Sequence, residues 1–219
     1  MDSVALTVQG DLLIQGLSDE TGISHKTNTK VLDVVRERTQ GLHGQLEASF
    51  DLSRFMSSHS SYNHLLQAYL GIYRPFERLL GQHHTLVANR YKTTLIENDL
   101  MALGATEDEI REVAECCLPS TFEENDSLYG ALYVLEGSNL GGQIIYRQIE
   151  SSLQINQDTG SSFFHGDGER TGLVWKNFLA ELEQRVISAD RAAEGACAMF
   201  NVFEIWLSQV AMKVGVCPQ

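Results

Sequence analysis

The sequence predicts an all-α fold, a single-domain bundle of about seven helices. Apolar residues recur at steps of three and four through most of the chain, and no segment alternates with a period of two. Only three prolines occur among 219 residues, which leaves room for long uninterrupted helices. Residues 1–28 are polar and weakly periodic, so we expect an N-terminal extension of low order before a helical domain over residues 29–215.

The first predicted helix runs from about Thr29 to Phe50. Its apolar stripe consists of Leu32, Val35, Thr39, Leu42 and Leu46. A second helix is expected to begin at Ser60 or Ser61, since serine is a favourable N-cap. Pro75 lies inside its pattern and predicts a kink there.

A third helix, from about Leu86 to Leu103, is expected to end at Gly104, a typical C-cap residue. Thr106 and Glu109 then have the spacing of a capping box. This pair predicts the start of a fourth helix, which we expect to continue to about Cys117.

The longest predicted helix covers about residues 126–153. A loop rich in Gly, Ser and Asp follows at about residues 156–168. Two further helices complete the bundle, with apolar stripes over residues 175–186 and 193–210.

Three glycines interrupt the middle of the longest helix, at Gly137, Gly141 and Gly142. Each is disfavoured in a helix by about 1 kcal/mol relative to Ala. Close helix packing, or a loop between two shorter helices, would explain them. The alternative is that a flat ligand lies against backbone without side chains. A phosphate-binding loop is excluded, because no Lys follows the glycines and no strand precedes them.

His43 lies at the edge of the first helix's apolar stripe, between Gly41 and Gly44. A neutral imidazole there is able to ligate iron, with space beside it for a wide planar ligand. The alternative is a histidine at the edge of the core that is hydrogen-bonded by a side chain such as Glu47.

Cationic residues in a chain of formal net charge −13 are candidates for binding an anion. Arg36 lies about two turns before His43, hence on roughly the same face, and Arg38 is close to both. Lys176 belongs to a helix near the other end of the chain. Solvated surface charge is the alternative for each of them.

The composition also excludes classes of function. Such an acidic surface repels phosphate backbones, so we expect no nucleic-acid partner. No apolar run approaches the roughly 20 residues of a membrane span, and the N-terminus lacks a secretory pattern. The cysteines, without metal-binding spacing, predict reduced thiols in a cytoplasmic protein; they are Cys116, Cys117, Cys197 and Cys217.

Two segments resemble the heme oxygenase family, specifically the bacterial branch often encoded beside bacteriophytochromes. Residues 36–47, RERTQGLHGQLE, are similar to the family's proximal helix, and residues 132–143, LYVLEGSNLGGQ, to its glycine-kinked distal helix. Residues 98–104 and 163–172 also resemble the bacterial forms. The resemblance extends from about residue 31 to about residue 207.

The resemblance implies a heme-oxygenase-like bundle with heme between the proximal and distal helices. His43 would be the axial iron ligand, and Glu47 would orient its imidazole or a nearby water. Arg36 and Lys176 match positions that bind the heme propionates. Thr39, within the proximal pattern, joins the implied heme-binding residues.

On the distal side, the resemblance implies catalytic roles for Gly137, Ser138 and Gly141, and contact with heme for Gly142. Gly137 and Gly141 would let the helix bend close over the iron. Ser138 stands where the mammalian-type enzymes carry an aspartate that organises water, and Asn139 or backbone groups would share that task.

The implied activity is oxidative cleavage of heme to biliverdin, with the IXα isomer expected, and release of CO and Fe(II). Heme would be substrate and cofactor together, and O2 the oxidant. No flavin or iron–sulfur motif is present, so electrons would come from a ferredoxin or a flavoprotein. A bacteriophytochrome would be a possible acceptor of the bilin.

Other classes share this helical scaffold. A non-catalytic heme or bilin carrier would keep His43 without the glycine-controlled oxygen site. Di-iron carboxylate proteins need several Glu and His residues in the bundle core, and the chain lacks an E-x-x-H pair. Thiamin-degrading relatives need a reactive cysteine with acidic partners.

Overall fold

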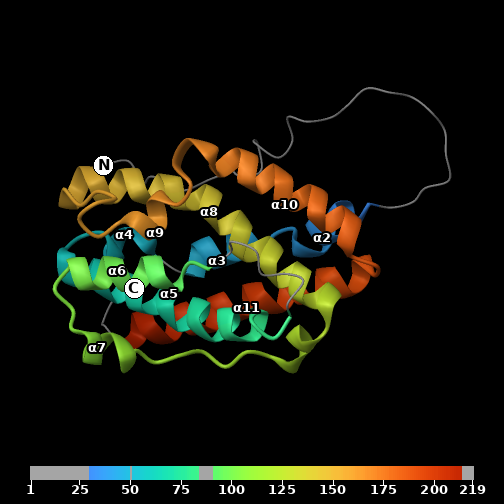
Figure 1. Ribbon diagram of the computed structural model, residues 1–219, viewed down its shortest axis with the longest axis horizontal. Helices are drawn as coiled ribbons and strands as arrows, with labels where there is room; N and C mark the ends of the chain where they lie inside the picture. Colours follow the sequence, from blue (N-terminus) through green and yellow to red (C-terminus); the bar gives the residue numbers. More distant parts are fainter. Residues whose placement is uncertain (1–29, 50, 84–90, 214–219) are drawn as a thin grey trace.

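The computed structural model describes residues 30–49, 51–83 and 91–213, and these residues fold as the expected all-α bundle (Figure 1). Within these ranges no strand occurs, and ten α-helices and two 3-10 helices are formed. In chain order these are α2 (Val31–Thr39), α3 (Leu42–Ser49), α4 (Leu52–Phe55), α5 (His59–Leu80), α6 (Thr93–Ala102), α7 (Glu107–Arg111), η1 (Ser120–Glu123), α8 (Asn125–Leu153), α9 (Ser162–His165), η2 (Gly168–Arg170), α10 (Thr171–Arg185) and α11 (Ala189–Lys213). The expected N-terminal extension lies outside the described residues.

The core forms where α11 packs on both α8 and α5, the other two of the three longest helices, and α10 packs on α8 (Figure 1). Helices α8 and α11 approach so closely that only glycine fits at two positions. A Cβ added to Gly130 would lie 1.7 Å from the Ala192 carbonyl oxygen, and one added to Gly195 would lie 1.9 Å from that of Ser127. Both distances are far below any van der Waals contact, so these glycines set the spacing of the two helices.

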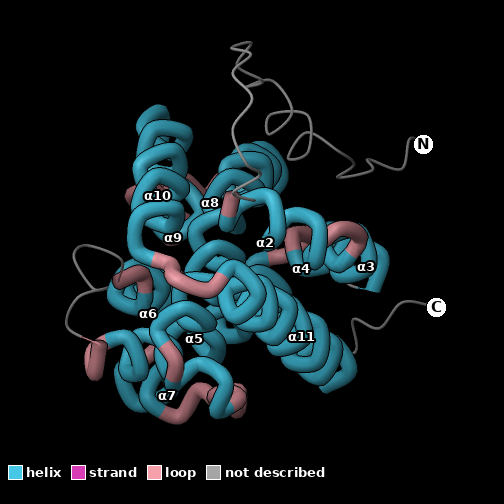
Figure 2. The backbone as a smooth tube through the Cα atoms, turned by 90° about the vertical axis from the view of Figure 1, so that its right-hand side faces the viewer, coloured by secondary structure: helices cyan, strands magenta, loops and turns pink. Residues whose placement is uncertain are grey.

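The single helix expected over residues 29–50 is wrong, because the chain breaks between α2 and α3. Gly41 has φ +89°, a left-handed conformation that ends α2 and redirects the chain before Leu42. Both halves still pack on α11, and Figure 2 shows α3 at the edge of the molecule beyond α2. The inference that Arg36 and His43 share a helical face therefore fails, since they belong to different helices.

The second and third helices differ from expectation mainly at their starts. Ser58 caps α5, because its hydroxyl accepts a hydrogen bond from the Ser61 backbone N–H at 3.1 Å. Helix α5 continues through Pro75 to Leu80. The expected start of the third helix at Leu86 lies outside the described residues, and α6 begins at Thr93. Gly104 has φ +95° just beyond α6, as predicted for a C-terminal cap.

The capping box of Thr106 and Glu109 is confirmed, with both of its hydrogen bonds formed. The predicted extension of that helix to Cys117 is wrong, since α7 ends at Arg111. The following segment instead runs along α5, where the Cys116 N–H donates to the Gly71 carbonyl at 2.9 Å. A tertiary hydrogen bond there replaces further helical turns.

Helix α8 is continuous through its three glycines, so the interpretation of a loop between two shorter helices is wrong. The region expected to be a loop, at about residues 156–168, contains the short helix α9 and the start of η2. The last two predicted helices are confirmed as α10 and α11. None of the helices in the described ranges combines the length and the apolar character that crossing a bilayer requires.

Candidate functional site

His43 is an exposed residue in the first turn of α3. Its ring meets Phe200 of α11 edge-on, with ring centroids 6.3 Å apart and planes at 77°. Cβ atoms added to Gly41 or Gly44 would meet no atom within 4 Å. The imidazole therefore stands on the flank of α11, between two positions that leave the adjoining surface open. Glu47 lies one turn further along α3.

Arg36 is half-buried in α2, and its Nε atom is buried without a hydrogen-bond partner among the described residues. A buried guanidinium nitrogen without a partner is costly, and an anionic ligand would satisfy it. Arg38 differs, since it is exposed and lies 3.8 Å from Asp190. The buried hydroxyl of Thr39 donates to the Val35 carbonyl at 2.8 Å. Thr39 therefore presents no unsatisfied hydroxyl to a ligand.

The three glycines of α8 have different surroundings. A Cβ added to Gly142 would lie 3.3 Å from the Phe164 carbonyl oxygen, so this glycine permits close packing of α9. At Gly137 the nearest atom is a ring carbon of Trp175 at 3.6 Å, an ordinary contact. At Gly141 nothing lies within 4 Å. Packing therefore explains Gly142, whereas Gly141 leaves the helix bare for another reason.

The hydroxyl of Ser138 makes one hydrogen bond within α8 and one to α5. Its Oγ donates to the Leu135 carbonyl at 2.7 Å and lies 3.2 Å from the Tyr73 hydroxyl. Burial raises the pKa of Tyr73 far above its ordinary value, which keeps the phenol protonated. The Tyr73 hydroxyl is therefore able to donate a hydrogen bond to Ser138. The two hydroxyls and the Leu135 carbonyl then form a short chain of hydrogen bonds beside the bare surface of α8.

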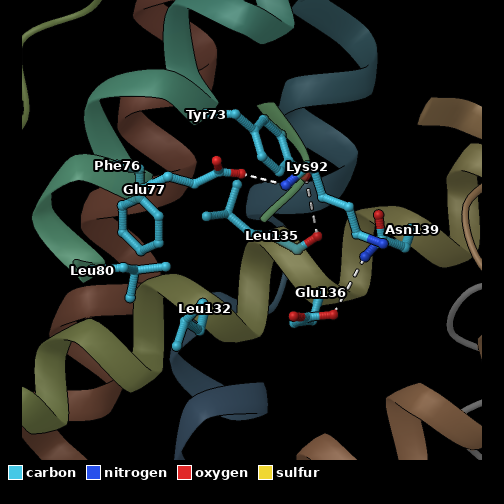
Figure 3. Close-up of a pocket in the computed structure, with 9 residues that line it drawn as sticks. All are labelled: Tyr73, Phe76, Glu77, Leu80, Lys92, Leu132, Leu135, Glu136 and Asn139. Atoms are coloured by element: carbon cyan, nitrogen blue, oxygen red, sulfur yellow. Dashed lines mark hydrogen bonds between the residues drawn. The ribbon is translucent and has the colours of Figure 1, made fainter. Parts of the chain in front are cut away.

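Two small cavities lie along the side of α8 that faces α5. Figure 3 shows the first, where Asn139 donates to Glu136 at 3.3 Å and the Lys92 backbone N–H donates to Glu77. The second is lined by Tyr69, Ser138, Asn139, Gly142, Phe163 and Phe164. Each has room for about one water molecule. His43 lines neither cavity, so they belong to the α5 side of the distal segment rather than to the side of α3.

The predicted site residues lie in three places: on α2 and α3, on the glycine segment of α8, and on α10. Helices α2 and α3 both pack on α11, and α10 packs on α2 and α8, so α11 and α10 connect the predicted proximal and distal segments. Lys176 is an exposed residue of α10, one position after the buried Trp175 that contacts Gly137. In the described part of the chain, no three His, Cys, Asp or Glu side chains gather as a metal site.

Sequence reasoning missed two polar residues that organise this region. Tyr73 has the spacing of an apolar stripe residue in α5, and its hydroxyl partner lies 65 residues away in the sequence. Asp99 is 2% exposed, and its carboxylate accepts three hydrogen bonds from Ser162 and Phe163. An acidic residue inside an apolar helical stripe is the one signal that would have marked Asp99.

Comparisons with known proteins identify what the chain is similar to. A family model described as heme oxygenase matches residues 29–209. A curated heme oxygenase of Xanthomonas campestris pv. campestris is 30% identical over 158 residues, covering 62% of this chain and 90% of that protein.

Two solved structures share the fold. The heme oxygenase of Leptospira interrogans aligns with a TM-score of 0.67 at 18% identity, covering 83% of this chain and 100% of that chain. The NO- and CO-bound heme oxygenase of Neisseria meningitidis aligns with a TM-score of 0.64 at 17% identity, covering 83% of this chain and 92% of that one.

Proposed function

The chain belongs to the heme oxygenase family, and on that premise we propose that it cleaves heme to biliverdin IXα, releasing CO and Fe(II). The reaction would consume O2 and electrons from an external donor. One observation carries the proposal beyond family membership. Helix α8 stays helical through three glycines and, at Gly141, leaves backbone that no other part of the described chain covers.

The described residues offer the groups that heme binding requires: an exposed imidazole, uncovered helix backbone and cations. We propose that heme lies between α3 and the glycine segment of α8, with His43 as the axial iron ligand. A Cβ added to Gly41 or Gly44 would meet no described atom within 4 Å. This open surface on both sides of His43 supports the assignment, since a flat ring system needs such space next to its axial ligand. We propose that Glu47, four residues after His43 on α3, orients the imidazole.

The propionates require cations. The buried Nε of Arg36, without a partner in the described chain, is the strongest candidate, because a carboxylate would satisfy it. Lys176 on α10 is the second, and its exposure suits a propionate that reaches the surface. Thr39 contributes packing to the site rather than a hydrogen bond, since Val35 already accepts from its hydroxyl.

The distal residues act by leaving space and by holding protons. When bound, the heme iron supplies the oxygen chemistry. We propose that Gly141, where an added Cβ would meet no described atom, leaves room for a diatomic ligand, and that Gly137, beside Trp175, lets α8 lie close to the iron; Gly142 permits close packing on α9. Ser138 donates to the Leu135 carbonyl and lies 3.2 Å from the Tyr73 hydroxyl, and we propose that its oxygen also accepts a hydrogen bond from water, in place of the aspartate of other family members.

The reductant is proposed to be an acidic ferredoxin or flavoprotein that approaches Arg36 and Arg38. Arg38 is exposed in an otherwise acidic protein, which suits an acidic partner. Arg38→Glu is expected to slow ferredoxin-driven turnover but not ascorbate-driven turnover. A ferredoxin-driven rate equal to that of the wild type would exclude this surface. A bacteriophytochrome remains the proposed acceptor of the bilin. The unbridged Cys116, Cys117 and Cys197 support a proposed cytoplasmic location.

Addition of hemin and then ascorbate in air tests the proposal. We expect a Soret band to appear and then decay into a biliverdin spectrum, with CO trapped by added deoxymyoglobin. A Soret band that survives ascorbate would identify the alternative, a non-catalytic heme or bilin carrier on the same fold. Absence of a Soret band would contradict both.

A further inference from the structure

A segment between α8 and α10, which we call the strap (residues 160–171), lies against α8 immediately beyond Gly141. Gln143 donates to the His165 carbonyl at 2.5 Å. The rings of Tyr146 and His165 meet edge-on with centroids 5.0 Å apart. Gly142 touches the Phe164 backbone. The strap therefore holds the turn of α8 that carries the bare glycine.

The strap is itself anchored to α6 through one buried carboxylate. Asp99 Oδ1 accepts hydrogen bonds from the Ser162 N–H at 2.8 Å and the Ser162 hydroxyl at 2.7 Å. Its Oδ2 accepts from the Phe163 N–H at 2.8 Å. Three hydrogen bonds from two successive residues to one buried side chain fix the start of α9. Gly160, with φ +124°, lets the chain turn tightly against Leu103 on the way.

The strap also reaches the distal hydroxyl groups. Phe163 packs edge-on against Tyr73, with ring centroids 5.2 Å apart. Phe163 and Phe164 line the same small cavity as Ser138. A movement of α9 would therefore shift both the backbone contact at Gly142 and the surroundings of Ser138, because tightly packed interiors transmit displacement.

We propose that Asp99 is a positioning residue that fixes the distal helix through the strap and so restricts oxygenation to one meso edge of the heme. The proposal rests on the proposed function and deepens it. It also gives a role to residues 98–104 and 163–172, two segments that carry no other assigned task. Asp99 lies in the first of these, and its partner Phe163 opens the second.

Asp99→Ala and Ser162→Ala test the proposal in two measurements. The first variant removes all three hydrogen bonds, and the second removes only the hydroxyl and leaves both amides on Asp99. Amide hydrogen exchange on protein without heme is expected to accelerate at residues 160–166 and 141–143, strongly in Asp99→Ala and weakly in Ser162→Ala. With hemin, the ratio of the major to the minor biliverdin isomers is expected to fall on the order of tenfold in Asp99→Ala.

Asp126→Asn is the matched control. The Asp126 carboxylate also accepts two backbone N–H groups, of Ile187 at 3.2 Å and Ser188 at 2.8 Å, but from the first turn of α8. Replacing this carboxylate by an amide is expected to lower the free energy of unfolding and to leave the ratio of biliverdin isomers unchanged.

Three results separate the possibilities. Faster exchange in the strap alone, with residues 141–143 unaffected, would overturn the coupling to α8. An isomer ratio in Asp99→Ala equal to that of Asp126→Asn would show that Asp99 is only structural. Wild-type protein that forms no bilin would contradict the proposed function, while the exchange measurement would still decide whether Asp99 positions α8. If Asp99→Ala does not fold, Ser162→Ala carries both measurements.

Discussion

The hydroxyl of Tyr73 in α5 lies 3.2 Å from the hydroxyl of Ser138 in α8. The Ser138 hydroxyl in turn donates a hydrogen bond to the Leu135 carbonyl at 2.7 Å. Burial keeps the Tyr73 phenol protonated, since it raises the pKa of this group. Helices α5 and α8 therefore share a fixed hydroxyl pair, and position 138 carries no carboxylate.

Tyr73→Phe is expected to remove the donor to Ser138 and slow bilin formation by about tenfold or more, with a larger solvent isotope effect. Folding stability is expected to fall by only about 1 kcal/mol, the value of one hydrogen bond. Tyr129→Phe is the control, because its hydroxyl bonds to Glu181 instead, at 3.1 Å. Equal turnover in Tyr73→Phe and wild type would show that the pair is structural.

His43→Ala is expected to weaken heme binding, change the spin state and abolish turnover. Because His43 is exposed, unfolding without heme should change by no more than about 0.5 kcal/mol. Absorption spectra measure the first effect and added imidazole should restore them in part. His59→Ala, at the exposed start of α5, is the control. Unchanged spectra in His43→Ala would assign the ligand elsewhere.

Gly141→Leu and Gly142→Ala are expected to act in opposite ways. A side chain at position 141 meets no neighbour, so stability should hold or rise by up to about 1 kcal/mol while turnover falls. A Cβ at position 142 presses on the Phe164 carbonyl at 3.3 Å, so stability should fall by about 1 kcal/mol. Urea unfolding without heme and turnover with heme measure the two effects. Normal turnover of Gly141→Leu would argue that this glycine faces solvent and not substrate.

Arg36→Met is expected to raise the dissociation constant for heme by about tenfold, the loss of one charge-assisted hydrogen bond. Stability without heme should change little, because the buried Nε makes no hydrogen bond to the described residues. Arg38→Met, at an exposed position, should leave heme affinity unchanged. Hemin titration of both variants distinguishes them, and equal affinities would remove Arg36 from the site.

Glu77 gives a pH dependence whose sign is fixed by its surroundings. Burial raises its pKa, outweighing the opposing hydrogen bonds from Thr93 and Lys92, and the nearby Glu97 adds to the rise. The folded state therefore binds this proton more tightly than the unfolded state does. The contribution of Glu77 to stability should fall as pH rises from about 4.3 through its raised pKa, and then level off.

The measurement is the free energy of unfolding of the wild type minus that of Glu77→Gln, between about pH 4 and pH 7. This difference is expected to decline across that window, since glutamine does not titrate. A difference that rises with pH would mean that the hydrogen bonds from Lys92 and Thr93, and not burial, dominate.

Features that are encoded within one helical turn were predicted correctly from the sequence. The capping box at Thr106 and Glu109 and the positive φ of Gly104 depend on residues within one turn, so a single segment specifies them. The extent of α8 was also predicted, in spite of its glycines, because its apolar stripe persists on both sides of them. The positions of heme-binding residues remain predictions from a family resemblance.

The two wrong helix boundaries have different physical causes. The break before α3 follows from the left-handed φ of Gly41, whereas α7 ends at Arg111 and the chain after it bonds to Gly71 of α5, a partner distant in the sequence. A helical period describes which face is apolar but not which neighbour covers it.

The sequence by itself determined that this chain is an all-α bundle with a glycine-bearing helix, because helix periodicity and capping are encoded within a few residues. Only the tertiary structure decided that Gly142 serves packing while Gly141 stays bare, and that Tyr73 holds Ser138 and Asp99 holds the strap. Those relationships are fixed by hydrogen bonds and close contacts between helices far apart in the chain, and no local pattern records such distances.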